Sequence, residues 1–459
     1  MQNRERFGSR LGFILISAGC AIGLGNVWKF PYITAANGGA AFILVYLLFL
    51  LILGIPVLTM EFAVGRASRK SILHAYSALE PSGTKWHLAG IMGVAGNYLL
   101  MMFYTVVSGW MLFYLFKMLR GDFAGLDAAA VADQFAAMTG NAPGQTVCML
   151  AMTALGFGIC AIGLEKGVER VTKVMMLLLI GLMLCLAVRS VTLPGAEAGI
   201  EYYLKPDFSK IFGHGLDHFN RVVFAAMAQA FFTLSIGMGS MAIFGTYIGR
   251  DRSLVGEAVT VTLLDTFVAI MAGMIIIPAC FAYGIDLQAG PKLIFITLPN
   301  VFNAMPNGRL WGSLFFLFML FAALSTLTGV FENILSFAMD ARGWSRKKAA
   351  LVNAAIIAAL SMPALLGYNL LSGVQPLGAD STILDFEDFL VSNNILPIGS
   401  LIYVLFCTLR SGWGFDRFLE EANTGRGLRF PTRLRGYCRF ALPLIIAYVL
   451  VMGYISYFR

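Results

Sequence analysis

The chain has 459 residues, of which 58% are hydrophobic and only 13% are charged. A soluble domain carries about 25% charged residues, so this composition excludes a soluble globular protein and indicates an integral membrane protein. The formal net charge of +8 could suggest nucleic acid, but the basic residues gather in short segments between apolar runs, as in membrane topology signals. We therefore expect membrane lipid, and no nucleic acid, among its partners.

Apolar runs of about 20 residues, the length that crosses a bilayer as a helix, recur along the whole chain. They predict an all-α integral membrane protein with about eleven transmembrane helices in one domain, residues 1–459. The expected helices lie near residues 11–34, 39–64, 89–117, 147–163, 171–190, 219–248, 255–284, 310–338, 349–366, 385–409 and 440–457.

Arginine and lysine concentrate in alternate loops, for example near residues 66–70, 250–252 and 426–439. By the positive-inside rule these loops face the cytoplasm. We expect a multi-pass protein of the cell membrane with a cytoplasmic N-terminus and, because the number of helices is odd, an extracellular C-terminus. The long inner loop before the last helix predicts an amphipathic helix around 415–422, and the outer loop near 291–308 predicts short helical pieces.

Two glycine-rich segments, residues 17–26 and 229–240, interrupt apolar runs. An unpaired main-chain group costs several kcal/mol in hydrocarbon, so a helix is broken at membrane depth only where other groups use the freed atoms. Matching breaks in two halves of a membrane protein are typical of a transporter. We predict a five-plus-five inverted repeat, residues 10–190 and 219–410, with helices 1 and 6 broken at the midplane and an extra helix at 440–457.

The breaks carry oxygen donors as well as glycines. The half-helix that ends near Ile22 presents carbonyls, which suit a sodium ion, and the half-helix that begins near Gly25 presents N–H groups, which suit a carboxylate. Asn26 adds an amide oxygen, and Thr233 and Ser235 supply hydroxyls at the second break. The alternative, close helix packing through small residues, explains the glycines but not the oxygen donors.

Residues 17–31, 227–240 and 321–329 resemble the neurotransmitter:sodium symporter family, and the similarity extends from about residue 10 to 410. The resemblance implies a sodium-coupled symporter, not an enzyme, that imports a neutral, hydrophobic or aromatic L-amino acid by alternating access. It also implies two sodium ions. Two alternatives remain open: a proton-coupled amino-acid carrier of the same plan, and an amino-acid sensor that does not transport.

The resemblance also implies where the substrate binds. Its carboxyl group would lie on the amides of residues 23–25 and on the Tyr104 hydroxyl, and its amine would meet main-chain carbonyls. Members that carry monoamines have an aspartate at the position of Gly23, so a glycine favours a full amino acid. The implied substrate-binding residues are Ala21, Gly23, Gly25, Leu100, Tyr104, Phe232, Thr233, Ser235, Met238, Ser325 and Val330.

Two sodium sites and a substitute for chloride follow from the same resemblance. Asp265 lies one helical turn from Ala269, where chloride-dependent members have a serine and many bacterial members a glutamate. We infer that Asp265 replaces the chloride, so that none is required; the alternative is a structural carboxylate satisfied by neighbouring hydroxyls. The implied first sodium site is Ala21, Asn26, Thr233 and Asp265, and the second is Gly19, Ile22, Ala322, Ser325 and Thr326.

The resemblance finally implies two gates. The outer gate would pair Lys29 with Asp388, or alternatively with Asp385, and the inner gate would pair Arg4 with Asp340. Lys29 stands where the family has an arginine. A lysine keeps the positive charge but lacks the bidentate fork of the guanidinium, so we expect a looser outer gate.

Overall fold

The structure of the protein, a computed structural model, describes residues 9–213, 215–287, 290–379 and 381–458. In these residues the regular structure is helical, apart from one isolated bridge that joins Arg252 to Arg426. The predicted all-α membrane architecture is confirmed.

Most of the helices are long and apolar, and several contain short π-helical turns, which are labelled η together with one 3₁₀ turn, η6. The first half of the chain comprises α1 (Arg10–Ala21), η1 (Gly25–Lys29), α2 (Phe30–Ala36), α3 (Ala40–Phe49), η2 (Leu50–Gly54), α4 (Ile55–Ser68), α5 (Ile72–Leu79), α6 (Leu88–Arg120), α7 (Ala128–Gly140), α8 (Ala142–Ile162), η3 (Leu164–Glu169), α9 (Arg170–Val191), α10 (Glu197–Leu204) and α11 (Ser209–Phe212). The second half comprises α12 (Leu216–Thr233), α13 (Ser240–Gly245), α14 (Leu254–Tyr283), η4 (Leu293–Thr297), α15 (Leu298–Ala304), α16 (Gly308–Arg342), α17 (Arg346–Leu360), α18 (Met362–Leu366), α19 (Ile383–Phe389), η5 (Leu390–Ile395), α20 (Leu396–Thr408), α21 (Phe415–Asn423), η6 (Thr432–Leu434), η7 (Tyr437–Ala441) and α22 (Leu442–Phe458).

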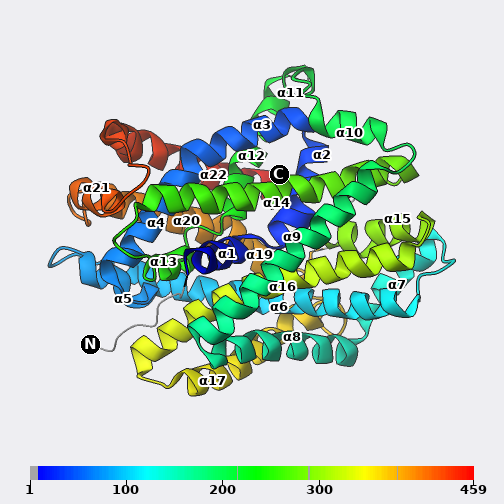
Figure 1. The fold of residues 1–459 in the computed structure, drawn as a ribbon, viewed down its shortest axis with the longest axis horizontal. Coiled ribbons are helices and arrows are strands. Elements are labelled where there is room, and N and C mark those ends of the chain that lie inside the picture. The colour runs from blue at the N-terminus through cyan, green and yellow to red at the C-terminus, as the bar shows by residue number, and fades with distance from the viewer. Residues whose placement is uncertain (1–8, 214, 288–289, 380, 459) are drawn as a thin grey trace.

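The long helices α6 and α16 lie side by side and α14 runs in roughly the same direction, whereas short helices gather at the two ends of the molecule. Helices α5 and α21 lie at one end and α7, α10 and α15 at the other (Figure 1). Helix α21 is the amphipathic helix predicted around 415–422, and η4 with α15 forms the predicted helical pieces of the outer loop.

The expected number of eleven membrane spans is not confirmed. Nine helices in the described part of the chain are long and apolar enough to cross a membrane, or ten if α1 and the following piece count as one bent span. The expected span near 219–248 is divided between α12 and α13, and it is not among these ten. The α12 half begins with Asp217 and His218 and carries Arg221, which lower its apolar character.

Both predicted helix breaks are present. Helix α1 ends at Ala21, and the piece that begins at Gly25 runs at 59° to it. Between α12 and α13, residues 234–239 leave the helix, and Ser235, Gly237 and Gly239 have φ values of 49°, 105° and 80°. A positive φ is strained for a residue with a side chain, so the two glycines make this break possible and Ser235 carries local strain.

Helices α4 and α13 approach each other through two glycines. A Cβ atom at Gly65 would lie 1.9 Å from the carbonyl oxygen of Ala242, and one at Gly245 would lie 2.4 Å from that of Phe62. These contacts are with backbone atoms, which cannot move aside as the tip of a side chain can. Adding even one methyl group at either glycine would therefore push the two helices apart. This close packing keeps the second half of the broken helix against α4.

We expect Gly65→Ala to lower the free energy of unfolding by about 2 kcal/mol, because overpacking in a dense core typically costs 1–3 kcal/mol. Thermal unfolding of the purified protein measures the effect. Gly158→Ala is the matched control, since Gly158 is exposed on helix α8 and an added Cβ there meets nothing within 4 Å. Equal melting temperatures for the two variants would contradict the proposed close packing.

Candidate functional site: the two helix breaks

The end of α1 and the middle of α16 form a cluster of oxygen atoms. The Thr326 hydroxyl donates to the carbonyl of Ile22 at 2.9 Å and lies 3.4 Å from that of Gly19. The Ser325 hydroxyl donates to the carbonyl of Ala322 at 2.8 Å. A Cβ at Gly19 would lie 3.1 Å from the Cβ of Ser325, so the two helices touch here. All five residues implied for the second sodium site therefore come together.

A second polar cluster joins the two breaks. Asn26 donates through Nδ2 to Thr233 Oγ1 at 3.1 Å and to Asp265 Oδ1 at 2.8 Å. Thr233 donates to Asp265 Oδ2 at 2.7 Å, and the amide of Gly23 donates to Asn26 Oδ1 at 3.1 Å. Asn26, Thr233 and Asp265 are buried, as is Ala21, the last residue of α1 and the fourth residue implied for the first sodium site.

Two side chains of this second cluster, Asn26 and Thr233, donate hydrogen bonds to one carboxylate. Asp265 is the charged member, and its charge is met by an amide and a hydroxyl rather than by a basic side chain. A buried carboxylate with neutral partners only is costly, and a cation beside it offsets that cost. Carbonyl, amide, hydroxyl and carboxylate oxygens are the ligands that hard cations prefer, so the donor chemistry of both clusters fits sodium.

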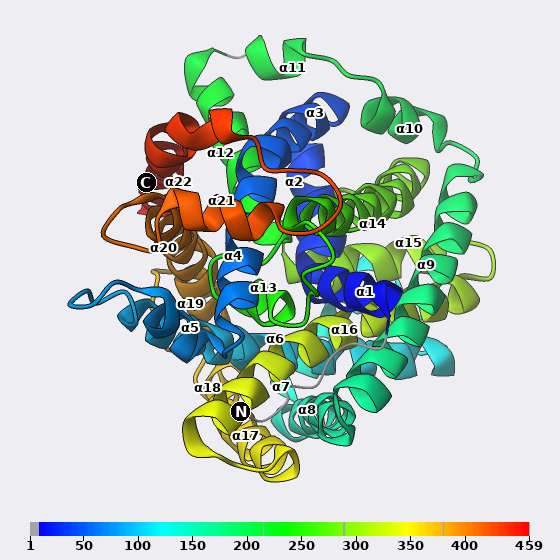
Figure 2. The same ribbon diagram turned by 60° about the vertical axis from the view of Figure 1, so that its left-hand side comes forward.

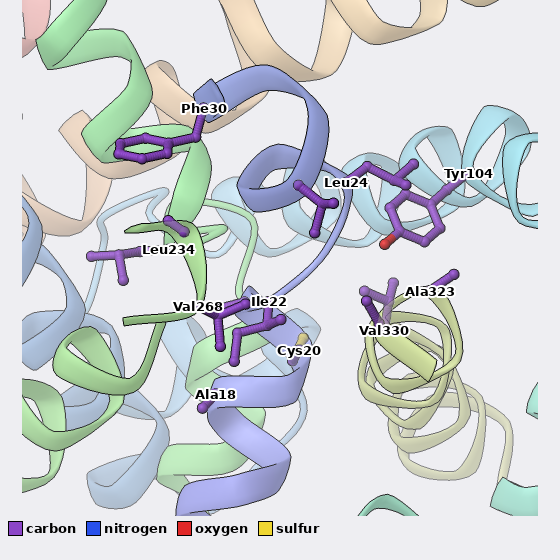
Figure 3. Close-up of a cluster of buried hydrophobic side chains, with 14 of the residues drawn as sticks. Ala18, Cys20, Ile22, Leu24, Phe30, Tyr104, Leu234, Val268, Ala323 and Val330 are labelled. Carbon is purple, nitrogen blue, oxygen red and sulfur yellow. The ribbon is translucent and has the colours of Figure 1, made fainter. Parts of the chain in front are cut away.

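The implied substrate residues surround the first break. A Cβ at Gly23 would lie 2.7 Å from the Tyr104 hydroxyl and 2.9 Å from Thr326 Oγ1, so a larger residue would displace these side-chain tips. Figure 3 shows Tyr104 directed at the space between the chain around Leu24 and the helix that carries Val330. The Tyr104 hydroxyl is buried near Thr326 and the main chain of Leu24, and it donates to no acceptor among the described residues. It is an unused donor aimed at the break.

The remaining substrate residues lie on the same elements or at the second break. Leu100 is buried one helical turn before Tyr104 on α6. Phe232 lies against Gly25, where a Cβ would be 2.5 Å from its ring. Ser235 and Met238 belong to the unwound segment between α12 and α13, and the Met238 carbonyl accepts a hydrogen bond from α6.

Sequence reasoning missed the residue that supports the second break. The carboxylate of Glu61 on α4 accepts hydrogen bonds from the amides of Gly237 (2.8 Å), Met241 (3.0 Å) and Ala242 (3.3 Å). Asn97 on α6 donates to the carbonyl of Met238 at 2.9 Å. An acidic residue in the middle of an apolar run was a signal that could have identified Glu61.

The resemblance also implies that Tyr46 and Gln229 stand where chloride-dependent members bind the ion, and both lie close to the second cluster. Gln229 donates through Nε2 to the carbonyl of Gly25 at 3.3 Å, and its Oε1 is buried without a partner in the described part of the chain. The Tyr46 hydroxyl is buried next to Thr233, Thr266 and Asp265, and it donates to no acceptor in the same part of the chain. Ala269 offers no hydroxyl.

At the outer gate, Lys29 lies over an aromatic ring. Its Nζ is 3.8 Å from the centroid of Phe232, and no ion pair joins it to an acidic residue among those that the structure describes. Asp388 is the acidic group that acts on Lys29 electrostatically, and it accepts a hydrogen bond from Ser392 at 2.7 Å. Asp385 instead caps helix α19, so of the two candidates Asp388 is the one that faces the gate.

At the inner gate, Arg4 lies outside the described residues, and Asp340 accepts a hydrogen bond from the amide of Ser71 at 2.7 Å. A second connection was not predicted. Tyr247, after α13, donates to Glu332 on α16 at 3.2 Å, and Arg346 binds both oxygens of that carboxylate, at 2.7 and 3.1 Å. This fork holds Glu332 in place as the acceptor for Tyr247.

Comparisons with known proteins extend over the whole chain. A model described as the "Sodium:neurotransmitter symporter family" matches residues 4–131 and 135–459. The sodium-dependent transporter YhdH of Bacillus subtilis is 35% identical over 99% of this chain and 99% of its own length. The sodium- and chloride-dependent GABA transporter 2 of Mus musculus is 27% identical over 73% of this chain and 62% of its own. The crystal structure of MhsT in complex with L-phenylalanine matches with a TM-score of 0.86 and 37% identity, over 99% of this chain and 100% of that one.

The gate geometry gives a test of which partner matters more to Lys29. We expect Lys29→Gln to weaken amino-acid binding about three- to ten-fold, because a buried cation–π contact contributes about 1 kcal/mol. Asp388→Asn should weaken binding less, because it leaves the ammonium on Phe232. Equilibrium binding in sodium buffer measures both, with Lys29→Arg as the charge-conserving control. A larger loss for Asp388→Asn would assign the gate to the ion pair instead.

Proposed function

The chain belongs to the sodium:neurotransmitter symporter family and is a sodium-dependent membrane transporter rather than an enzyme, and from this premise we propose that it imports a neutral, hydrophobic amino acid, aromatic ones included, together with sodium. The observation that carries the proposal is the meeting of the two breaks. Asn26 from the first break bonds to Thr233 at the end of α12 beside the carboxylate of Asp265. Ion ligands and main-chain groups for a substrate are thereby concentrated at one point.

Two sodium ions are the proposed co-substrates. Ala21, Asn26, Thr233 and Asp265 are assigned to the first, and the cluster around Thr326 to the second. The two sets flank the same half-helix end, whose free carbonyls carry the negative end of the helix dipole. The inward sodium gradient and a membrane potential worth about 2.3 kcal/mol per charge per 100 mV would supply the energy.

A full amino acid is the proposed substrate class. Gly23 leaves no side chain in the space next to Tyr104, so a substrate carboxylate can approach the hydroxyl and the amides of the second half-helix. The side chains assigned to the pocket wall are Leu100, Phe232, Met238 and Val330, and none of them carries a charge. The L-phenylalanine bound to MhsT, a structure 37% identical to this chain, supports an aromatic amino acid as one such substrate.

Alternating access is the proposed mechanism, based on two inverted repeats at residues 10–190 and 219–410. The breaks let the halves of the first and sixth helices move separately around a fixed site. The basic loops place the end that carries α5 and α21 in the cytoplasm, and the end that carries α10 and α15 outside. The outer gate is then Lys29 with Phe232 and Asp388.

Dependence on sodium tests this function directly. Purified protein should bind labelled L-phenylalanine, or another neutral aromatic amino acid, in sodium buffer and not in potassium or choline buffer. Equal binding in all three buffers would contradict symport.

The second sodium site is tested by Thr326→Val, which removes its central hydroxyl. We expect the sodium concentration for half-maximal binding to rise about ten-fold, which corresponds to the roughly 1.5 kcal/mol of one contact to a charged group. Thr328→Val is the matched control, because that hydroxyl lies on the same helix and donates to the carbonyl of Ser325.

The assignment of Asp265 as the substitute for chloride gives a separate prediction. Asp265→Asn removes the negative charge but keeps the shape, so a chloride ion should be needed to balance the sodium. We expect amino-acid binding by Asp265→Asn combined with Ala269→Ser to be stimulated by chloride and lost in gluconate, while the natural chain binds equally in both. Indifference of the double variant to chloride would make Asp265 a structural carboxylate.

A further inference from the structure

An arginine-rich segment follows α21 and leads into the last helix. Five arginines stand within fourteen residues, and all five are exposed. We call this segment, residues 426–439, the arginine strip; its arginines are Arg426, Arg429, Arg433, Arg435 and Arg439. The transport mechanism proposed above does not use them.

The arginine strip has a fixed shape. Asn423 and Phe430 exchange two hydrogen bonds, from Phe430 N to Asn423 Oδ1 at 2.6 Å and from Asn423 Nδ2 to the Phe430 carbonyl at 3.1 Å. The Phe430 ring is 3% exposed and packs at 5.0 Å from that of Phe418 on α21. Arg426 pairs through its backbone with the loop between α13 and α14, at 2.8 Å to Asp251 and 3.0 Å to Ser253. Basic residues that only set the orientation of a protein in the membrane need their positive charge, but they do not need an ordered backbone such as this one.

Apolar side chains place the strip at the surface of the bilayer. Leu428 and Phe440 are 57% and 65% exposed, and Leu444, at the start of the spanning part of α22, is 70% exposed. The guanidinium of Arg439 lies 5.5 Å from the Phe440 ring. Exposed apolar residues interleaved with arginines, at the start of the candidate membrane span Thr432–Ile455, are typical of a segment that lies among lipid headgroups.

Few carboxylates neutralise the strip. Asp416 on α21 pairs with Arg435, whose guanidinium also lies 5.1 Å from the Phe415 ring. No ion pair joins Arg429, Arg433 or Arg439 to an acidic residue within the described ranges. Three guanidinium groups, each with several donors, are therefore available to an anion at the membrane surface.

We propose that the arginine strip binds the phosphate headgroups of anionic phospholipids in the cytoplasmic leaflet and thereby adjusts the rate of transport; the leaflet rests on the orientation proposed above. Arginine forks bind phosphate oxygens in pairs, and the ordered backbone lowers the entropic cost of collecting three of them. The exposed Leu428 and Phe440 side chains suit the acyl region beneath the same headgroups.

A buried ion pair connects the strip to the moving helices. Arg66 at the end of α4 is fully buried and donates to Glu421 Oε1 at 2.6 Å and to the carbonyl of Arg252 at 2.7 Å. Arg250 lies 3.4 Å from the other oxygen of Glu421. Figure 2 shows α21 lying across α4 and beside α20. Lipid bound to the strip is thus attached through α21 to α4 and to the loop that follows α13.

The test uses the full chain in liposomes of phosphatidylcholine alone or with phosphatidylglycerol. The variant Arg429→Gln/Arg433→Gln/Arg439→Gln is compared with Lys70→Gln/Lys347→Gln/Lys348→Gln, which removes the same charge from other exposed positions at the same end, Lys347 and Lys348 being in the first turn of α17. Retention of phosphatidylglycerol is measured by native mass spectrometry. We expect the strip variant to retain at least about ten-fold less than the natural chain, since each basic residue near the surface contributes to binding, and the control to be unchanged.

Transport and a soluble competitor complete the test. Phosphatidylglycerol should change the sodium-dependent uptake rate of the natural chain and of the triple-lysine control variant. It should leave the uptake rate of the arginine-strip variant unchanged. Equal lipid retention by the two variants, or displacement of the lipid by millimolar glycerol phosphate, would overturn the proposal. Lipid retention is measured without substrate, so a failure of the proposed amino-acid transport would appear separately, as absent sodium-dependent binding by the natural chain.

Discussion

Main-chain groups set free by two helix breaks are the constraint on which the rest of the chain depends. In hydrocarbon each such group costs several kcal/mol unless it is bonded, so each break needs a partner from another helix. Glu61 supplies it at the second break, where it accepts three amides, and Thr326 at the first, where it donates to freed carbonyls. Because these partners come from α4 and α16, both helices must lie directly against the breaks, and Gly65 and Gly245 permit that approach.

The two breaks also depend on each other. Asn26 accepts from the amide of Gly23 on its own side and donates to Asp265 on the other, so one side chain joins the first break to α14 and, through Thr233, to the second. An ion or substrate that binds here exchanges these hydrogen bonds for its own contacts. Its net affinity is the difference between the two sets. The site is therefore sensitive to the position of every helix that contributes to it.

The sequence could predict features whose signals are local. Glycines inside apolar runs predicted both helix breaks, and the alternation of apolar and charged residues predicted the amphipathic helix α21. The sequence could not predict which distant side chains would meet: Lys29 faces the ring of Phe232 rather than a carboxylate, and Glu332 is held by Arg346. Such pairs depend on how helices rotate against each other after packing. The count of eleven spans stays unconfirmed, because α12 and α13 lie on either side of the second break, α12 carries polar residues, and the pair is not among the candidate spans.

The contacts that close the two ends of the molecule differ in strength. At the end with α21, Ser9 donates to Glu169 at 2.7 Å and Tyr247 donates to Glu332 at 3.2 Å, and both acceptors are carboxylates. A hydrogen bond to a charged group contributes about 1.5–3 kcal/mol, and Lys173 and Arg346 hold these acceptors in place.

At the opposite end the ammonium of Lys29 lies on the ring of Phe232, a contact worth about 0.5–2 kcal/mol. A ligand shifts such an equilibrium only by its difference in affinity for the two states. On the gates proposed above, breaking the Ser9 and Tyr247 contacts at the α21 end would take more of the binding energy of the proposed ions and substrate than breaking the Lys29 contact. A lysine in place of an arginine at that gate increases this difference, because it gives up the bidentate pair with Asp388 that an arginine can form.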